Sequence, residues 1–270
     1  METDATTEAG IYFEVTGQGP PIVLGHSFLC DGAQWREQVR GLAGDYRLIN
    51  LDLRGHGRSA PVTDPFTLYD AVDDVVDVLD QLGIERAIWC GLSIGGMVAM
   101  RAALTVPERV ERLIIMDSDA GIERLRKRIQ YWFMAMGVKT FGLRPFLNEI
   151  LRLMFGESTR REQPDLVEEW RHRFAAVDVP STLTALVGLT GRDSILDRLA
   201  DIRVPSLVLV GEEDASLPVP ISRRIHDALP NSQFIEIPKA GHLSALEQPE
   251  LVNEAIRRFL MQGAEVSTLG

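Results

Sequence analysis

Short apolar runs alternate with helical patterns along most of this chain, and this alternation constrains the fold more than any other feature. In the first half, the β-rich runs cover residues 22–24, 47–51, 87–90 and 112–116. Between the second and third runs, residues 68–82 carry apolar side chains at helical spacing. Nearly continuous apolar strands separated by helices indicate a parallel sheet covered on both faces. The chain is therefore predicted to be an α/β protein.

A helical block interrupts the alternation. From about residue 118 to residue 201 the strand pattern is absent, and glycines and prolines separate several helical segments. The alternation then resumes, with apolar runs at residues 206–210 and 233–237 and helical patterns at residues 220–229 and 249–261. A long helical block between two strands of one sheet predicts an inserted cap. We expect a core domain of residues 1–118 and 197–270 and a helical cap of residues 119–196.

Composition and charge exclude several classes of protein. The formal net charge of −11 disfavours nucleic acid as a partner, because phosphate binding needs a basic surface. The one basic cluster, residues 124–128, is interpreted as a solvated helix face. The first eight residues are acidic and polar, unlike a secretory signal, and no apolar stretch is long enough to span a membrane. Cys30 and Cys90 are too few for a disulfide framework. We expect a cytoplasmic protein without a nucleic-acid or membrane partner.

The sequence Gly-Leu-Ser-Ile-Gly-Gly at residues 91–96 is the strongest chemical signal. It follows the apolar run that ends at Cys90 and opens a helical pattern that extends to about Leu104. This strand–turn–helix context is typical of a nucleophile elbow, which would project the hydroxyl of Ser93 from the sheet. The flanking glycines suit such a turn, because a side chain there would collide with the neighbouring strand or helix. Ser93 is the predicted nucleophile.

A serine hydroxyl is a poor nucleophile until a positioned base removes its proton. Three histidines follow Ser93 in the sequence. His172 lies in the predicted cap and His226 lies inside a helical pattern, whereas His242 comes soon after the apolar run of residues 233–237. Loops at the carboxyl edge of a parallel sheet converge on one site. His242 is therefore the predicted base.

Asp214 is the predicted acid that orients this base. It comes four residues after the apolar run of residues 206–210, at the same edge of the sheet as His242. It would accept the Nδ1 proton of His242, fix the tautomer and stabilise the imidazolium. Two other acids remain open as alternatives, namely Glu213, one residue earlier, and Asp117, which follows the fourth apolar run.

The oxyanion that forms during acyl transfer needs hydrogen-bond donors. The amide of Ile94, directly after the nucleophile, is one predicted donor. The amide of Phe28, in the loop after the first apolar run, is the other. His26 lies on the loop that carries Phe28, which comes before Ser93 in the chain and is a different loop from that of Ser93. We expect His26 to hold its loop by hydrogen bonds rather than act as the base.

With these residues in place, the chain resembles the α/β-hydrolase superfamily over nearly its whole length. Residues 52–59, Asp-Leu-Arg-Gly-His-Gly-Arg-Ser, are similar to the family's loop after its fourth strand. Residues 197–214 resemble the return from cap to core, and the Gly-His and Glu-Gln-Pro of residues 241–249 also fit. The serine-nucleophile branch, with 3-oxoadipate enol-lactonase-like and small carboxylesterase members, is the most similar. The resemblance implies an α/β-hydrolase fold, with a mostly parallel central sheet, helices on both faces and an inserted helical cap.

The chain departs from the family pattern at the oxyanion loop. His26 and Ser27 stand where the family usually has His-Gly, so the loop lacks a glycine's backbone freedom. The hydroxyl of Ser27 is a candidate substrate contact. Trp132 in the cap and Leu243 next to the predicted base complete the predicted substrate-binding residues.

These features predict a serine hydrolase that acts on a carboxylic ester or lactone through an acyl-enzyme intermediate, without a metal or organic cofactor. Apolar and aromatic cap side chains favour a small apolar or aromatic acyl group. The alternatives are perhydrolysis, carbon–carbon bond cleavage or a lyase reaction with the same triad, and a receptor-like protein that turns its ligand over slowly. Fold and triad alone do not distinguish these reactions. A homodimer is left open.

Overall fold

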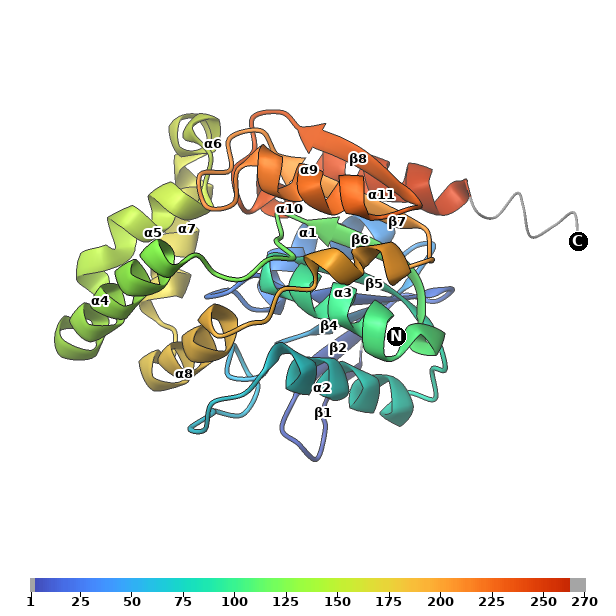
Figure 1. The fold of residues 1–270 in the computed structure, drawn as a ribbon, viewed down its shortest axis with the longest axis horizontal. Coiled ribbons are helices and arrows are strands. Elements are labelled where there is room, and N and C mark those ends of the chain that lie inside the picture. Colours follow the sequence, from blue (N-terminus) through green and yellow to red (C-terminus); the bar gives the residue numbers. More distant parts are fainter. Residues whose placement is uncertain (1–2, 263–270) are drawn as a thin grey trace, which may run out of the picture.

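Eight strands form one mostly parallel sheet in the computed structural model, which describes residues 3–262. The termini of the predicted core domain, residues 1–2 and 263–270, lie outside the described residues. The order across the sheet is β1-β2-β4-β3-β5-β6-β7-β8 (Figure 1). β1 pairs with β2 and β2 with β4 in antiparallel fashion, and the other pairs are parallel. The strands are β1 (Thr3–Thr6), β2 (Tyr12–Thr16), β3 (Pro21–Gly25), β4 (Arg47–Leu51), β5 (Ala87–Leu92), β6 (Val110–Met116), β7 (Ser206–Gly211) and β8 (Ser232–Ile237).

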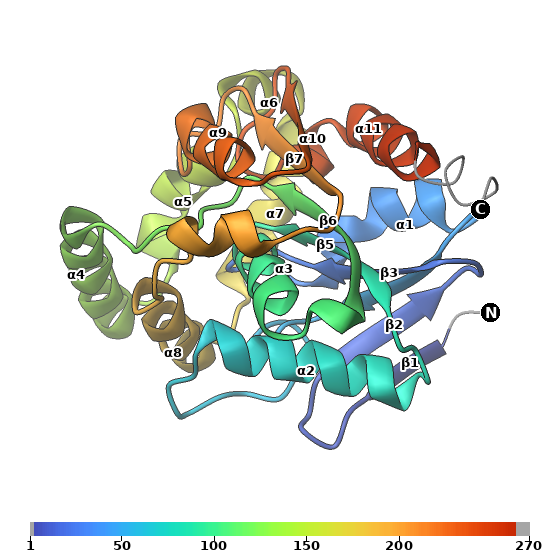
Figure 2. The ribbon, with the colours of Figure 1, turned by 45° about the vertical axis from the view of Figure 1, so that its right-hand side comes forward.

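Helices cover both faces of this sheet, which confirms the predicted α/β architecture. One face carries α2 (Leu68–Gln81), α3 (Ile94–Thr105) and α9 (Val219–Ala228), and the other carries α1 (Arg36–Leu42) and α11 (Pro249–Met261) (Figure 2). Successive strand residues point to opposite faces. Val23 and Trp89 therefore join the core beneath α2 and α3, while Leu24 and Cys90 join the core beneath α1 and α11. Burial on both faces explains why these strands are almost wholly apolar.

Between β6 and β7 the chain is helical, as the sequence pattern predicts. The segment contains α4 (Leu125–Phe141), α5 (Leu147–Met154), α6 (Glu157–Glu162), α7 (Pro164–Ala175) and α8 (Val179–Thr190), grouped at one end of the molecule (Figure 1). Trp170 and Phe174 of α7 join the same apolar core as α1 and α11. The remaining helical elements are α10 (Ser244–Glu247) and the 3₁₀ turns η1 (Gly32–Trp35), η2 (Pro107–Arg109), η3 (Arg144–Phe146) and η4 (Leu196–Asp201).

A buried arginine ties the two ends of this helical segment together. Arg192, just after α8, forms ion pairs with Asp119 at 3.2 Å and with Glu123 at 3.0 Å, both near the start of the segment. Its Nε donates to the carbonyl oxygen of Gly121 at 2.9 Å. The guanidinium is almost fully buried and also donates to the carbonyl oxygen of Leu189 in α8 at 2.9 Å. The two ends of the segment therefore meet at one buried polar junction.

Glycines allow α3 to pack closely on the sheet beneath the predicted nucleophile. A Cβ on Gly95 would overlap the backbone of Gly25 in β3, and a Cβ on Gly91 would overlap the backbone of Gly95. Backbone atoms cannot move aside as flexible side chains can. These glycines are therefore required by the close approach of strand and helix, as the sequence analysis expected.

Replacing Gly95 with alanine should destabilise the protein by about 1–3 kcal/mol or more, because α3 must move away from β3. Urea unfolding followed by circular dichroism measures this change. Gly44→Ala is the matched control, since a Cβ on Gly44 meets no atom within 4 Å. Equal stability of the two variants would show that α3 can shift freely.

Candidate active site

Ser93 occupies a strained turn between β5 and α3. Its backbone has φ 55° and ψ −114°, in a region that residues with a side chain rarely adopt. The Ser93 amide donates to the carbonyl oxygen of Met116 at 2.8 Å, and its own carbonyl accepts from the hydroxyl of Ser118 at 2.8 Å. The end of β6 thus holds the turn in place. Persistent strain of this kind is typical of functional sites.

His242 and Asp214 are joined by a buried hydrogen bond. His242 Nδ1 lies 2.8 Å from Asp214 Oδ2, and both side chains are almost fully buried. The second oxygen, Oδ1, accepts from the amides of Ser216 and Leu217, each at 2.8 Å. Because the ionised carboxylate can only accept, Nδ1 of His242 is the donor. In a neutral imidazole, Nε2 is then left with a free lone pair.

Two opposing effects set the pKa of His242. Burial lowers it, because the charged imidazolium loses its hydration. The charge and hydrogen bond of Asp214 raise it, as does the charge of Asp117, and the net result is a pKa above the ordinary value of 6.5. Asp214 therefore stabilises the protonated form that a general base must reach during catalysis.

The pH dependence of activity should follow from this raised pKa. A base must be neutral to accept a proton, so kcat/KM should fall as the pH drops through the His242 pKa, with a midpoint above 6.5. A pH–rate profile measures the midpoint. Asp214→Asn should move it to lower pH, because the raising interaction is lost while burial remains. A midpoint below 6.5 in the unaltered protein would contradict the geometry.

The third hydrogen bond of a triad is not formed. Within residues 3–262, neither Ser93 Oγ nor His242 Nε2 takes part in any protein hydrogen bond, although Ser93 is only 6% exposed and His242 is more buried. The two residues are linked through the end of β6, since Ser118 binds Ser93 and Asp117 binds Ser244, two residues after His242. Bonds between nucleophile and base are often long until substrate is bound.

Asp117 lies beside the pair but does not bond to the imidazole. Its Oδ1 accepts from the amide of Gly211 at 2.7 Å, and its Oδ2 accepts from the hydroxyl of Ser244 at 2.5 Å. It therefore connects the loop that carries Asp214 with the segment that follows His242. Complete burial, together with the nearby charge of Asp214, raises the pKa of Asp117 well above its usual range. Asp117 thus links the two loops through its carboxyl group.

The other alternative acid, Glu213, binds elsewhere. Its carboxylate accepts from the amide of Ser158 at 2.8 Å and from the hydroxyl of the same residue at 2.6 Å. Ser158 lies in α6, so Glu213 fixes the helical segment to the loop after β7. Of the three acids left open by the sequence, Asp214 alone is the hydrogen-bond partner of His242 within the described chain.

Glu247 anchors the loop of the predicted base, a role that the sequence analysis did not identify. Its carboxylate accepts from the amides of Gly241 at 2.9 Å and Leu243 at 3.1 Å, on either side of His242. It also accepts from the amide of Gly156 at 2.8 Å, at the start of α6. Burial raises the pKa of Glu247 to about 7. The sequence offered one signal for this residue, the Glu-Gln-Pro at residues 247–249. The sequence analysis noted it as part of the family resemblance and predicted no contact for Glu247.

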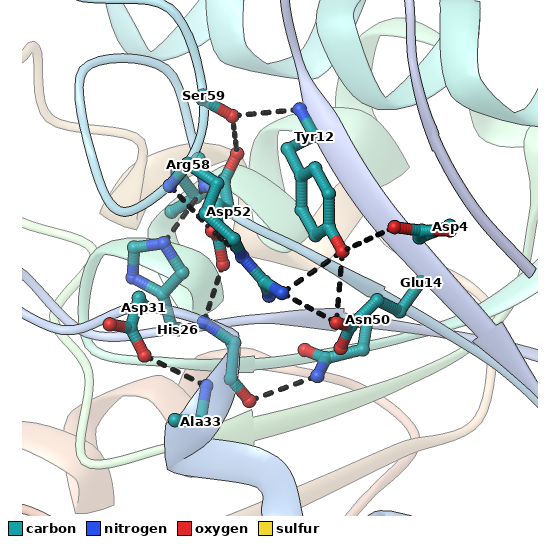
Figure 3. A network of polar contacts seen from close by, with 12 residues as sticks. Asp4, Tyr12, Glu14, His26, Asp31, Ala33, Asn50, Asp52, Arg58 and Ser59 are labelled. Carbon is teal, nitrogen blue, oxygen red and sulfur yellow. Dashed lines mark hydrogen bonds and ion pairs between the residues drawn. The ribbon is translucent and has the colours of Figure 1, made fainter.

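His26 holds the predicted oxyanion loop, as expected. Its Nε2 accepts from the amide of Leu53 at 2.8 Å, so its Nδ1 carries the proton and donates to the carbonyl oxygen of Ser27 at 2.7 Å. Burial lowers the pKa of His26 and keeps it neutral. Asp52 is bonded to the same loop, because its side chain accepts from the amide of Gly32 at 2.6 Å. Arg58 and Ser59 also donate hydrogen bonds to Asp52 (Figure 3).

The predicted oxyanion donors have unused amides. In the described part of the chain, neither the Phe28 amide nor the Ile94 amide donates to a protein acceptor. Ile94 is the first residue of α3, where helix amides have no acceptor within the helix. Both donors nevertheless remain predictions.

The three predicted substrate contacts lie in different surroundings. Ser27 is fully buried, and its hydroxyl has no partner among the residues that the structure describes. Leu243 is fully buried beside His242, whereas Trp132 is 58% exposed on α4. Their contacts with substrate remain predictions.

A cleft of about 1090 Å³ lies on the side of the loop after β3 that carries Leu29 to Gly32. Its walls come from the loop after β3, the loop after β4, the outer strands and the connection from α7 to α8. None of Ser93, Asp214 and His242 lines it. The arginines on its walls, Arg36, Arg58 and Arg173, are already paired with carboxylates. The cleft is therefore lined by part of the predicted oxyanion loop but not by the three residues of the candidate triad.

Comparisons with known proteins agree with this fold. A sequence profile of the Alpha/beta hydrolase family matches residues 22–255. The structure of a thermophilic esterase from Thermogutta terrifontis is 32% identical, with a TM-score of 0.90 over 97% of this chain and 98% of that chain. Est816, an N-acyl homoserine lactone degrading enzyme, is 31% identical, with a TM-score of 0.81 over 92% and 96%. The 3-oxoadipate enol-lactonase 2 of Acinetobacter baylyi is 26% identical over 96% of both chains.

Proposed function

Because the chain belongs to the alpha/beta hydrolase family, we propose that it cleaves carboxylic esters or lactones with Ser93 as nucleophile, His242 as base and Asp214 as orienting acid. The hydrogen bond of 2.8 Å between His242 Nδ1 and Asp214 Oδ2 carries the proposal. It fixes the tautomer whose Nε2 can accept the proton of Ser93. Esterase and lactonase relatives support this substrate class.

In the proposed reaction, Ser93 Oγ attacks the substrate carbonyl carbon while His242 Nε2 takes the hydroxyl proton. The amides of Phe28 and Ile94 donate to the oxyanion of the tetrahedral intermediate. When the intermediate collapses, the imidazolium gives its proton to the leaving oxygen and an acyl-enzyme remains. Water then attacks the ester carbonyl, with His242 again as base, and releases the acid and Ser93. For a lactone, the leaving oxygen stays attached to the acyl group.

The side chains around this centre suit a small acyl group. Leu243 supplies an apolar surface next to His242, and Ser27 supplies a hydroxyl next to the Phe28 amide. An unpartnered buried hydroxyl gains a hydrogen bond when a polar substrate group reaches it.

Rapid mixing with p-nitrophenyl butyrate tests the proposal. We expect repeated turnover, with butyryl-enzyme detected by intact mass in quenched samples. A pH-stat assay, which measures the acid released, extends the test to cyclic esters with a set of lactones. Release of a single equivalent of p-nitrophenol without further turnover would instead favour the receptor-like alternative. A rate equal to that of buffer, with no acylated protein, would contradict the proposal. Added hydrogen peroxide distinguishes a perhydrolase, which would transfer the acyl group to peroxide.

A further inference from the structure

The outer side of α4 carries an apolar stripe that no part of the described chain covers. Its residues recur at i, i+4, i+7, i+8 and i+11, the spacing of one helix face. They are 48–71% exposed, and they comprise Leu125, Ile129, Trp132, Phe133 and Met136. We call this set the outer stripe. Contiguous exposed apolar surface of this kind usually marks a site of interaction.

The opposite side of α4 already packs on the protein. Val138 is buried there, Tyr131 and Met134 are partly buried, and the helix contacts α8. Lys127 on this side donates to the carbonyl oxygen of Ser216 at 2.8 Å. The helix therefore has two apolar sides, and its attachment to the protein uses the inner one. The outer stripe is not needed to hold α4 in place.

Basic residues border the stripe along both edges. Arg126 lies seven residues before Phe133, on the edge that Phe133 forms. Arg128 lies four residues before Trp132 and Lys139 seven residues after it, on the other edge. α4 contains no Asp or Glu, although the whole chain has a net charge of −11. This helix is thus a local basic and aromatic surface on an acidic protein.

We propose that the outer stripe of α4 docks on a lipid bilayer surface that contains anionic headgroups. The apolar side chains would enter the boundary between headgroups and acyl chains, and the flanking arginines would pair with lipid phosphates. Tryptophan favours this boundary because its ring is apolar and its N–H is polar. None of the helices described within residues 3–262 is long and apolar enough to span a membrane, so the helix would lie on the surface.

Charge favours this occupant over a second copy of the chain. A symmetric contact between two α4 helices would place the basic residues of one against those of the other. Anionic headgroups instead match both the charge and the apolar stripe. The sequence analysis expected no membrane partner because no segment could span a bilayer, and docking on a surface needs no such segment. The proposal does not depend on the catalytic roles assigned above.

Intrinsic fluorescence offers a direct test, because Trp132 is exposed while Trp35, Trp89 and Trp170 are at most 2% exposed. The full-length protein is titrated with vesicles of phosphatidylcholine alone and of phosphatidylcholine mixed with phosphatidylglycerol. We expect a blue shift and protection from acrylamide with the anionic vesicles, together with co-sedimentation that weakens as salt is added.

Two variants locate the contact while Trp132 remains as the reporter. Arg126→Gln with Arg128→Gln should weaken vesicle binding about five-fold per base, or roughly 25-fold together. Leu125→Ser with Ile129→Ser should weaken it by at least roughly tenfold. The matched controls on α1 and α11 are Arg40→Gln with Arg258→Gln, and Leu251→Ser with Met261→Ser, all at exposed positions. Thermal unfolding should be unchanged in all four proteins.

Absence of binding to anionic vesicles would overturn the proposal, as would binding that the α4 variants leave unaltered. Light scattering coupled to size-exclusion chromatography tests the alternative occupant, a second copy of the chain. A dimer that the Leu125/Ile129 variant dissociates, without vesicle binding by the original protein, would assign the stripe to a second copy instead.

Discussion

Replacing Ser93 with alanine is expected to lower kcat for a short-chain p-nitrophenyl ester by roughly 10⁶-fold, the loss typical of a serine nucleophile that acts as one unit with its base. The variant lacks the only atom that attacks the carbonyl in the proposed mechanism. It should remain folded, because the Ser93 hydroxyl makes no hydrogen bond within the described residues that the alanine would lose. Initial rates over a long time course measure the difference.

Ser206→Ala is the matched control for this experiment. Ser206, at the start of β7, is 1% exposed. Among the residues that the structure describes, its hydroxyl bonds only to the carbonyl oxygen of Val204, at 3.1 Å. Its loss should leave kcat nearly unchanged. If Ser93→Ala retained more than a small fraction of the activity, another nucleophile or a direct attack by water would have to carry the reaction.

Replacing Asp214 with asparagine should lower kcat by roughly 10⁴-fold. The amide nitrogen cannot accept the Nδ1 proton of His242, so the imidazole would adopt the wrong tautomer and Nε2 would no longer be the base. The geometry of the loop should survive, because the amide oxygen can still accept from Ser216 and Leu217. Steady-state kinetics at a pH above the His242 midpoint measure the loss.

Asp117→Asn separates this role from that of the neighbouring carboxyl. Asp117 links Gly211 and Ser244. In the asparagine variant, the amide oxygen can still accept from the Gly211 amide, and the amide nitrogen can donate to the Ser244 hydroxyl oxygen. We expect kcat within roughly tenfold of the original, the cost of one imperfect hydrogen bond. If Asp117→Asn lost as much activity as Asp214→Asn, the assignment of the acid would have to be shared between them.

The central strands were predictable because both of their faces are buried. Such strands read as continuous apolar runs, and β3 to β7 match the runs identified in the sequence within two residues at each end. The edge strand β8 also matches its run, although only its last residue, Ile237, is buried. β1 and β2 were missed. β2 is an outer strand whose buried and half-buried residues alternate over five positions, and β1 is a four-residue polar edge strand. Outer strands gain stability from pairing rather than burial, so they leave a weaker pattern.

Chain position suggested the pairing of His242 with Asp214, because both follow strands that end at one edge of the sheet. The buried links around them could not be read from spacing. Asp117 meets Ser244 across 127 positions of sequence, and Glu247 meets Gly156 across 91. Such contacts depend on how the helical segment and the last helices pack, which no local pattern specifies.

The apolar residues of α4 show a second limit of sequence patterns. Helical spacing correctly indicated a helix with apolar residues. It could not distinguish two apolar sides of one helix, so it did not show which side of α4 carries Trp132. The structure shows Val138 buried on the inner side and Trp132 exposed on the outer side.

Covalent labelling with a fluorophosphonate, followed by peptide mass mapping, tests the central claim most directly. The reagent phosphonylates an activated serine, so it reports nucleophile and base together without knowledge of the natural substrate. We predict one label per chain on Ser93, no label in Ser93→Ala, and strongly slowed labelling in His242→Ala. Labelling of a different serine, or ester turnover by a protein that the probe does not label, would contradict the proposed mechanism.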